Sequence, residues 1–338
     1  MEHHSNVAHA AYIDLRRSLM DSAVSDIQGT PTLVVRGRRK YWYDSYRVGT
    51  EVKKRYIGED SDDLRQRLDR YRDIKAEEEA RRKSRTRLVR ILRAEGFMGI
   101  DAGTGSILNA MAGAGVFRLG GTVVGTHAFR LYEGELGVRY GFDETAQTGD
   151  VDIASFERLS LALDDQVDPP LEEVLSDFSF TPAPTLDKHR SFRWQQSRKD
   201  LLVEFLTPSF SAEEGLRRLE ALGVDAQALH HLNYLIAEPI KAVALYRSGV
   251  LVQVPRPERF AIHKLIVADR RRDGIDGLKS RKDVAQAKFL VGVLAHDRPD
   301  ELSEALEDAR SRGPRWRDRI SATLEREPEI AQTLSELA

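Results

Sequence analysis

Hydrophobic residues recur along the chain at helical spacing near both ends and at strand-like spacing in the middle. Ala10–Ile27 is predicted to be a helix because Leu15, Leu19 and Val24 fall at about helical spacing. Ser61–Glu95 contains neither Gly nor Pro, and its middle, KAEEEARRKSRTR, has almost no apolar residues. We expect one long charged helix there, part of which projects as an arm.

Between these two helices the pattern changes to short runs of β-branched and aromatic residues. Gly37 and Gly49 punctuate these runs, which predicts a small meander of two or three strands. After residue 256 the spacing is helical again, and the expected helices are Arg259–Arg272, Lys282–Ala295, Pro299–Arg312 and one from Pro314 to the end.

The middle of the chain mixes both patterns. A short apolar strand is expected to turn into a helix at Gly125-Thr126, and LLVEFLTP at Leu201–Pro208 reads as a buried strand with one charge. The other expected elements are a loop with a short helix at Asp164–Pro184, a helix at Ala212–Leu222 and a hairpin at Lys241–Pro255. The chain is therefore predicted to be α+β, with an N-terminal helix, hairpin and long helix (1–95), a mixed α/β core (96–255) and a helical C-terminal domain (256–338).

Composition excludes several classes of protein. Hydrophobic residues make up 41% and charged residues 31%, which is ordinary for a globular protein. No run approaches the roughly 20 apolar residues of a membrane span, and the first residues lack a signal peptide's pattern. We therefore expect a cytoplasmic protein without a membrane partner. Because the chain has no cysteine, disulfides, thiolate zinc sites and cysteine nucleophiles are excluded.

Charge is unevenly distributed although the net charge is only −2. Between Arg36 and Met98, 20 Lys and Arg stand against 12 Asp and Glu. This basic region suits a nucleic-acid partner, and aromatic residues interleave with its basic ones at positions 38–43. A solvated helix, with aromatic residues pairing across strands, explains the same pattern, and both interpretations stay open.

Two carboxylates stand out in the core sequence TGDVDIA. Asp150 and Asp152 are two residues apart on a predicted strand, so both project from one face while Val151 and Ile153 face the other. Like charges placed side by side indicate a bound cation. Glu204 is a third carboxylate in an apolar strand, where an unpaired charge is costly.

The predicted strand-to-helix turn supplies the second chemical feature. Gly125 and Thr126 offer backbone N–H groups and a hydroxyl at a helix N-terminus, which suits a phosphate. A rival turn at Gly120-Gly121 would leave a shorter strand, so Gly125 is preferred. Carboxylates that hold two magnesium ions, together with a backbone cradle for phosphates, are what transfer from a nucleoside triphosphate requires.

These motifs resemble the nucleotidyltransferase superfamily of the DNA polymerase β type. The family pattern is an apolar strand ending in Gly-Gly, Gly-Ser or Gly-Thr, then Asp-x-Asp or Asp-x-Glu, then a third acid on a later strand, and VVGTHAF, TGDVDIA and LLVEFLTP look like its three parts. The chain is also similar, over about residues 96–294, to bacterial nucleotidyltransferase-fold proteins of uncertain function. That likeness rests on VGTHAF, LGVRY, TGDVDIA, LTP and PERFAIHKL.

The resemblance implies a function and roles for named residues. It implies a polymerase β-like core that moves a nucleoside monophosphate from an NTP, such as ATP, to a hydroxyl and releases pyrophosphate. Asp150, Asp152 and Glu204 would be the catalytic ligands of two Mg²⁺ or Mn²⁺ ions, and Gly125 and Thr126 would hold the triphosphate. RNA 3′ ends, proteins and small molecules remain open as acceptors.

Basic residues on the first C-terminal helix extend the expected nucleotide site. Lys264 and Arg271 share a helix face, so both can reach nucleotide phosphates, and a basic solvent-exposed face explains the same pattern. In related nucleotidyltransferase-like toxins, a lysine on a helix that begins after such a proline is associated with the active site, and a toxin-like or defence role is implied by that likeness alone. Lys279, Arg281 and Lys282 form a further basic edge for RNA or phosphate.

Two features set this sequence apart within the family pattern. The turn and the acids are separated by an insert, LYEGELGVRYGFDETAQ, which we expect to be a substrate-facing loop or strand pair. The turn also carries Thr126 where the pattern allows glycine or serine as well.

Other functions fit the sequence less well. The glycines of AGAGVFRLGG do not have the spacing of a dinucleotide-binding site, and no P-loop motif is present. A glycosidase pair of Asp150 and Glu204 would leave the basic helices unexplained. The main alternative is a catalytically inactive nucleotidyltransferase-fold module that binds nucleic acid or a partner protein.

Overall fold

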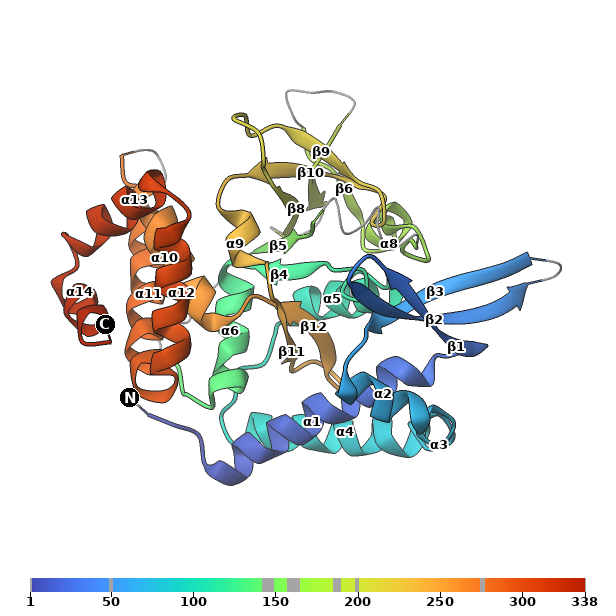
Figure 1. Ribbon diagram of the computed structural model, residues 1–338. Coiled ribbons are helices and arrows are strands. Elements are labelled where there is room, and N and C mark those ends of the chain that lie inside the picture. Colours follow the sequence, from blue (N-terminus) through green and yellow to red (C-terminus); the bar gives the residue numbers. More distant parts are fainter. Residues whose placement is uncertain are drawn as a thin grey trace.

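A mixed β-sheet lies at the centre of the protein, with helices on several sides of it (Figure 1). This computed structural model describes residues 2–48, 51–141, 149–156, 165–184, 190–197, 201–273 and 277–337. The strand order is β4-β5-β8-β10-β9, and β6 pairs with β7, which pairs with β8. The strands are β4 (Thr122–Val124), β5 (Asp150–Ala154), β6 (Phe180–Pro182), β7 (Arg193–Gln196), β8 (Leu202–Pro208), β9 (Leu216–Leu219) and β10 (Val224–Leu229).

The central pair of strands, β5 and β8, is parallel, whereas β4 pairs with β5 antiparallel. β8 has two neighbours on its other side, because β7 pairs with Val203 and Glu204 while β10 pairs further along from Leu206. The expected buried strands at residues 150–154 and 202–208 are confirmed. The hairpin predicted at Lys241–Pro255 is also confirmed, as β11 (Ile240–Ala244) and β12 (Val250–Val254).

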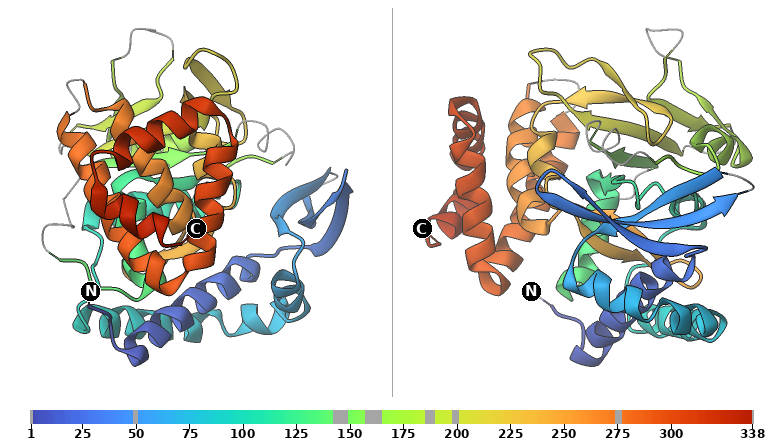
Figure 2. Two further views of the ribbon diagram at one scale, coloured as in Figure 1. Left: turned by 60° about the vertical axis from the view of Figure 1, so that its left-hand side comes forward. Right: turned by 45° about the vertical axis from the view of Figure 1, so that its right-hand side comes forward.

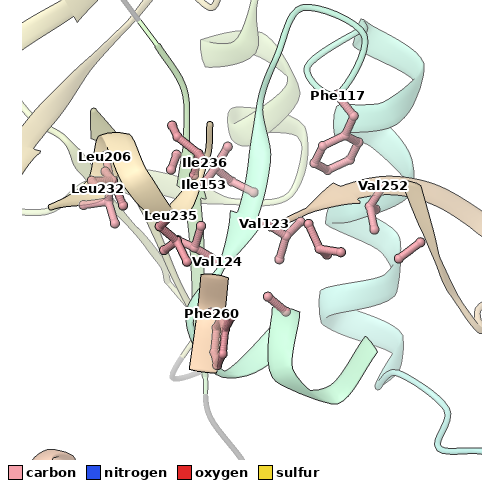
Figure 3. Close-up of a cluster of buried hydrophobic side chains, with 14 of the residues drawn as sticks. Phe117, Val123, Val124, Ile153, Leu206, Leu232, Leu235, Ile236, Val252 and Phe260 are labelled. Carbon is pink, nitrogen blue, oxygen red and sulfur yellow. The ribbon is translucent and has the colours of Figure 1, made fainter. Parts of the chain in front are cut away.

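The hydrophobic core is built around this sheet and the helices beside it. Val123 is fully buried, and Figure 3 shows it gathered with Phe117 and Val252, while Leu232, Leu235 and Ile236 lie together beside β4. The helices of this part are α5 (Ala102–Ala114), α6 (Gly125–Leu136), α8 (Leu171–Asp177) and α9 (Leu232–Leu235).

The C-terminal helices form one layer on one side of the sheet (Figure 1). They are α10 (Pro257–Arg270), α11 (Gly277–Asp297), α12 (Pro299–Ser311), α13 (Pro314–Leu324) and α14 (Pro328–Ser335). The expected helices are confirmed here, except that the last one is two helices separated near Pro328. α10 contacts α11, α12 and α13 within the layer and α9 in the core, so it ties the layer to the core.

The N-terminal part lies at the other side of the molecule (Figure 2). It contains α1 (Asn6–Ser25), the three-stranded sheet β1 (Thr30–Arg36), β2 (Arg39–Val48) and β3 (Glu51–Glu59), and the helices α2 (Asp62–Asp69), α3 (Tyr71–Ala76) and α4 (Glu78–Ala94). The predicted meander is therefore confirmed. α1 and α4 share a small core with Val243 and Leu245 of the β11–β12 hairpin region.

The prediction of one projecting helix over residues 61–95 is wrong. The chain forms three helices with breaks at Arg70 and Glu77, and α4 packs along α1. Arg85 is only 4% exposed, because it donates to Ser22 Oγ at 2.6 Å and to Glu78. Charged residues that looked solvent-exposed in the sequence thus lie inside a helix–helix interface.

The helix predicted at Ala212–Leu222 is also wrong. Leu216–Leu219 is strand β9, which pairs antiparallel with β10. The two leucines three residues apart imitate helical spacing, but pairing with the neighbouring strand decides the conformation. Across the described residues, no helix combines the length and apolar character needed to cross a membrane.

Candidate functional site

Strand pairing brings the predicted acids onto one face of the sheet. Asp152 lies opposite Val124 on one side and opposite Glu204 on the other, as residues paired across β4, β5 and β8. Val151 and Ile153 are fully buried, so Asp150 and Asp152 share the opposite face of β5, as the alternation predicted. The fold therefore places three carboxylates on one face of two adjacent parallel strands.

Gly125 stands directly against Asp152 at the start of α6. Its φ is +65°, and a Cβ added there would lie 2.3 Å from Asp152 Oδ2. Only glycine satisfies both the backbone conformation and the close approach. Gly120 and Gly121 precede β4, so the preferred turn is the one that meets the acids. Among the described residues no side chain caps the N-terminus of α6, which leaves its first N–H groups available to an anion.

The surroundings of Asp152 favour the protonated form of its carboxyl group. Burial, followed by the negative charges of Glu204 and Asp150, raises its pKa from 3.8 to about 7. Lys264 and Arg271 act in the opposite direction and lower this pKa. Positive charge brought close to Asp152 would thus stabilise its ionised form.

Glu204 already has a cationic partner. Arg193, its neighbour on β7, places Nε 2.6 Å from Glu204 Oε1. Within the part of the chain that the structure describes, no three His, Asp or Glu side chains stand as a group that could hold a metal ion. The three acids share a face, but one of them is turned toward an arginine.

Lys264 and Arg271 lie at the C-terminal half and end of α10, and both contact one acid that the sequence analysis did not single out. Lys264 Nζ donates to Asp283 Oδ1, and Arg271 Nη1 donates to Asp283 Oδ2 at 2.7 Å. Asp283 is 2% exposed. Both predicted nucleotide-binding cations are therefore held on the same buried carboxylate.

Lys282 is a third cation near the acids. It is half-buried on α11, and burial together with the positive charge of Lys264 lowers its pKa, whereas Asp283, Asp150 and Asp152 raise it. Burial is the main cause that lowers the pKa of His127, on the first turn of α6, to about 4, and the charges of Arg130 and then Lys282 add to it. The start of α11 thus lies near both the acids and the turn.

Aromatic packing fixes the C-terminal helices against α6. Phe260 of α10 packs on Phe129 and Tyr132 of α6, with ring centroids 6.4 and 5.3 Å apart. Phe289 of α11 packs on Phe129 at 5.9 Å. Because α6 begins beside Asp152, these contacts set the position of α10 and α11 relative to the acids.

The insert between turn and acids differs from its prediction in its first half. Leu131–Leu136 continues α6 and buries Tyr132, so this stretch is neither a loop nor a strand pair. Tyr140 then folds back and donates to the carbonyl of Phe129 at 2.5 Å. Residues 142–147 of the insert lie outside the described residues.

Arg193 and Asp283 are the site residues that sequence reasoning missed. Arg193 follows a stretch without a recognisable motif, and its role depends on β7 pairing with β8. Asp283 had a weak signal, since an apolar helix of mixed pattern carries it beside the basic pair Arg281 and Lys282. Its burial, which makes it important, could not be read from spacing.

Comparison with known families agrees with this geometry. A model of a family described as nucleotidyltransferase matches residues 102–311, which include β4, α6, β5, β8, α10 and α11. A family described only as a domain of unknown function matches residues 12–66. The comparison with curated proteins gives no match. Since the first match covers well over half of the 338 residues, this chain belongs to that nucleotidyltransferase family.

Proposed function

We propose that the protein moves a nucleoside monophosphate from an NTP to a hydroxyl acceptor and releases pyrophosphate. The observation that carries this proposal is the row of Val124, Asp152 and Glu204 across three adjacent strands, with Gly125 directly after Val124 and against Asp152. A phosphate cradle and carboxylates in register are the two parts that such a transfer needs side by side. The same order of strand, turn and acids supports a core of the polymerase β type.

The acids suit a hard divalent cation. Asp150, Asp152 and Glu204 present only oxygen donors, which Mg²⁺ and Mn²⁺ prefer. Burial and then the negative charges of Glu204 and Asp150 raise the pKa of Asp152, and a cation would neutralise those charges. These three residues would hold two ions, with Arg193 displaced from Glu204. Bound there, the ions would neutralise phosphate charge and make the acceptor hydroxyl more acidic.

The protein's own groups account for the remaining requirements. N–H groups at the start of α6, with the Thr126 hydroxyl, would hold phosphate oxygens. Lys264 and Arg271 would offset the charge that accumulates on the leaving pyrophosphate. The acceptor oxygen bonds to the α-phosphorus, the bond to the bridging oxygen breaks, and the hydroxyl proton passes to solvent.

Several classes of acceptor are compatible with the proposed reaction. The N-terminal sheet exposes Arg38, Lys40, Lys53 and Lys54, which supports an RNA acceptor or another nucleic-acid partner. Protein side chains and small molecules remain candidates. Incubation with each of four labelled NTPs, total RNA and total protein would identify both the nucleotide and the acceptor from the fraction that becomes labelled.

Replacing both strand acids tests the mechanism. Asp150→Asn with Asp152→Asn should abolish labelling, because the two substitutions remove the charge that holds the metal ions. Asp225→Asn is the matched control, since Asp225 lies on β10 of the same sheet and pairs with Arg190 at 2.7 Å. Labelling that survives in the double variant would refute the mechanism.

One observation favours the alternative of an inactive binding module. Glu204 is paired with Arg193 at 2.6 Å, as expected of an acid whose partner is structural. An inactive module would give no label with any NTP yet bind nucleic acid or a partner tightly. Arg193→Gln should then change neither property by more than about twofold.

A further inference from the structure

We propose that Asp283 is a positioning residue, which holds Lys264 and Arg271 in the orientation that receives the phosphates of the nucleotide. This inference rests on the proposed function and adds a residue that touches no substrate. Asp283 lies on α11, whereas Lys264 lies on α10 and Arg271 caps its C-terminus. One carboxylate on a separate helix thus fixes two cations at once.

The geometry around Asp283 is that of a bridge. Each carboxylate oxygen accepts from a different cation, Oδ1 from Lys264 Nζ and Oδ2 from Arg271 Nη1 at 2.7 Å. The side chain of Asp283 is 3% exposed, that of Lys264 9% and that of Arg271 39%. The Lys264–Asp283 pair is therefore buried, whereas the Arg271 side chain reaches solvent.

Burial explains why the two cations depend on Asp283. An ammonium group as buried as that of Lys264 is costly unless a counter-charge lies beside it. Asp283 supplies that counter-charge, and the Phe260 ring, 5.1 Å from Lys264 Nζ, adds a cation–π contact. Without Asp283, Lys264 would turn outward, and Arg271 would swing into solvent.

Packing on α6 connects the bridge to the proposed site. α10 and α11 are both fixed to α6 through Phe129, and α6 starts at the glycine that touches Asp152. Phosphates placed on the α6 turn would therefore be held at the start of a helix that packs against both helices of the bridge.

A binding measurement separates this inference from the proposed function. Inorganic tripolyphosphate, titrated calorimetrically into the full chain, reports phosphate binding without chemistry, base or acceptor. Asp283→Asn should weaken its binding at least about tenfold, because the cations lose their orientation. In a Lys264→Met, Arg271→Met background the same substitution should change binding less than about twofold, because Asp283 then has no cation to orient.

Asp21→Asn is the matched control. Asp21 also bridges two cations, Arg67 at 2.9 Å and Arg81 at 3.0 Å, but it lies on α1. It should lower thermal stability as Asp283→Asn does and leave tripolyphosphate binding unchanged. If Asp283→Asn destabilises the fold, the Lys264→Met, Asp283→Asn pair removes both buried charges and should restore stability without restoring binding.

Three results would overturn the inference. Wild-type protein that does not bind tripolyphosphate has no phosphate site for Asp283 to support. Unchanged binding by Asp283→Asn would make the residue purely structural, and tighter binding would show that its carboxylate competes with phosphate. Loss of NTP labelling with retained, Asp283-dependent tripolyphosphate binding would refute the transfer reaction and leave this inference standing.

Discussion

At the residue scale, the candidate site depends on how closely Gly125 approaches Asp152 and on how Asp152 is aligned with Glu204. Gly125 has a left-handed backbone and stands where any side chain would meet Asp152 Oδ2. Asp152 and Glu204 are fixed by strand register, so their separation follows from the β5–β8 pairing. A methyl group at position 125 therefore disturbs the acid without changing any charge.

Gly125→Ala should reduce NTP labelling by at least about a hundredfold, since a misplaced catalytic group costs that much in rate. Labelled-NTP transfer under the conditions used for wild type measures the effect. Gly113→Ala is the control, because Gly113 is exposed on α5 and a Cβ added there would meet nothing within 4 Å. That change should leave transfer intact and stabilise the helix by up to about 1 kcal/mol. Full transfer by Gly125→Ala would contradict the geometry.

At the element scale, a buried ion pair docks the N-terminal sheet onto the core. Asp165 accepts from the N–H of Tyr56 on β3 at 2.6 Å and from Arg118, and Arg118 donates to the carbonyl of Tyr56 at 2.7 Å. Arg118 and Asp165 are 18% and 11% exposed. Both backbone groups of Tyr56 are thereby held by the core.

Arg118→Met should loosen the sheet, because it leaves Asp165 without its charged partner. We expect the protection of the Tyr56 amide against hydrogen exchange to fall by the equivalent of about 2 kcal/mol. Arg39→Gln removes an exposed pair of the same sheet, Arg39 with Glu59 at 3.4 Å, and should cost less than about 0.5 kcal/mol. Equal effects of the two changes would mean that Arg118 does not dock the sheet.

Elements with an unambiguous pattern were predictable, and those decided by tertiary contacts were not. The strand and turn ending at Gly125, the strand alternation of Asp150 to Ile153 and the hairpin near residue 248 follow from local sequence. Strand β9 does not, because Leu216 and Leu219 fit a helix until β10 pairs with them. The role of Asp283 could not be predicted for a similar reason, since only the packing of α10 on α11 buries it.

At the scale of the whole molecule, the N-terminal segment packs against α6, the helix that begins beside Asp152. His4 stacks on Phe97 with ring centroids 3.6 Å apart and lies 3.2 Å from Glu133 Oε1 on α6. Glu133 also accepts from the N–H of Met98 at 2.6 Å. Burial raises the pKa of Glu133 from 4.5 to about 7, and it lowers the pKa of His4 from 6.5 to about 4.

These shifts make global stability depend on pH. Because the folded state favours protonated Glu133, its contribution is complete below pH 4.5 and is lost as the pH rises through about 7. Glu133→Gln keeps an acceptor for Met98 and cannot ionise. It should therefore exceed wild type in free energy of unfolding by about 1–3 kcal/mol near pH 8, and match it near pH 4.5.

Urea unfolding of both proteins across this range measures the difference. The contribution of His4 has the opposite direction, because it is present above pH 6.5 and lost as the pH falls through about 4. Both proteins contain His4, so its contribution largely cancels in the comparison. A variant that is less stable than wild type near pH 8 would show that ionised Glu133 is favoured in the fold.

The parallel pairing of β5 with β8 also sets when the proposed site can first form. Asp152 and Glu204 meet only after that pair forms, and Asp283 lies later still in the chain. A chain still on the ribosome therefore lacks a complete site until most of its length has been translated. A truncated or stalled product would therefore carry the turn and the first acids without the rest of the proposed site.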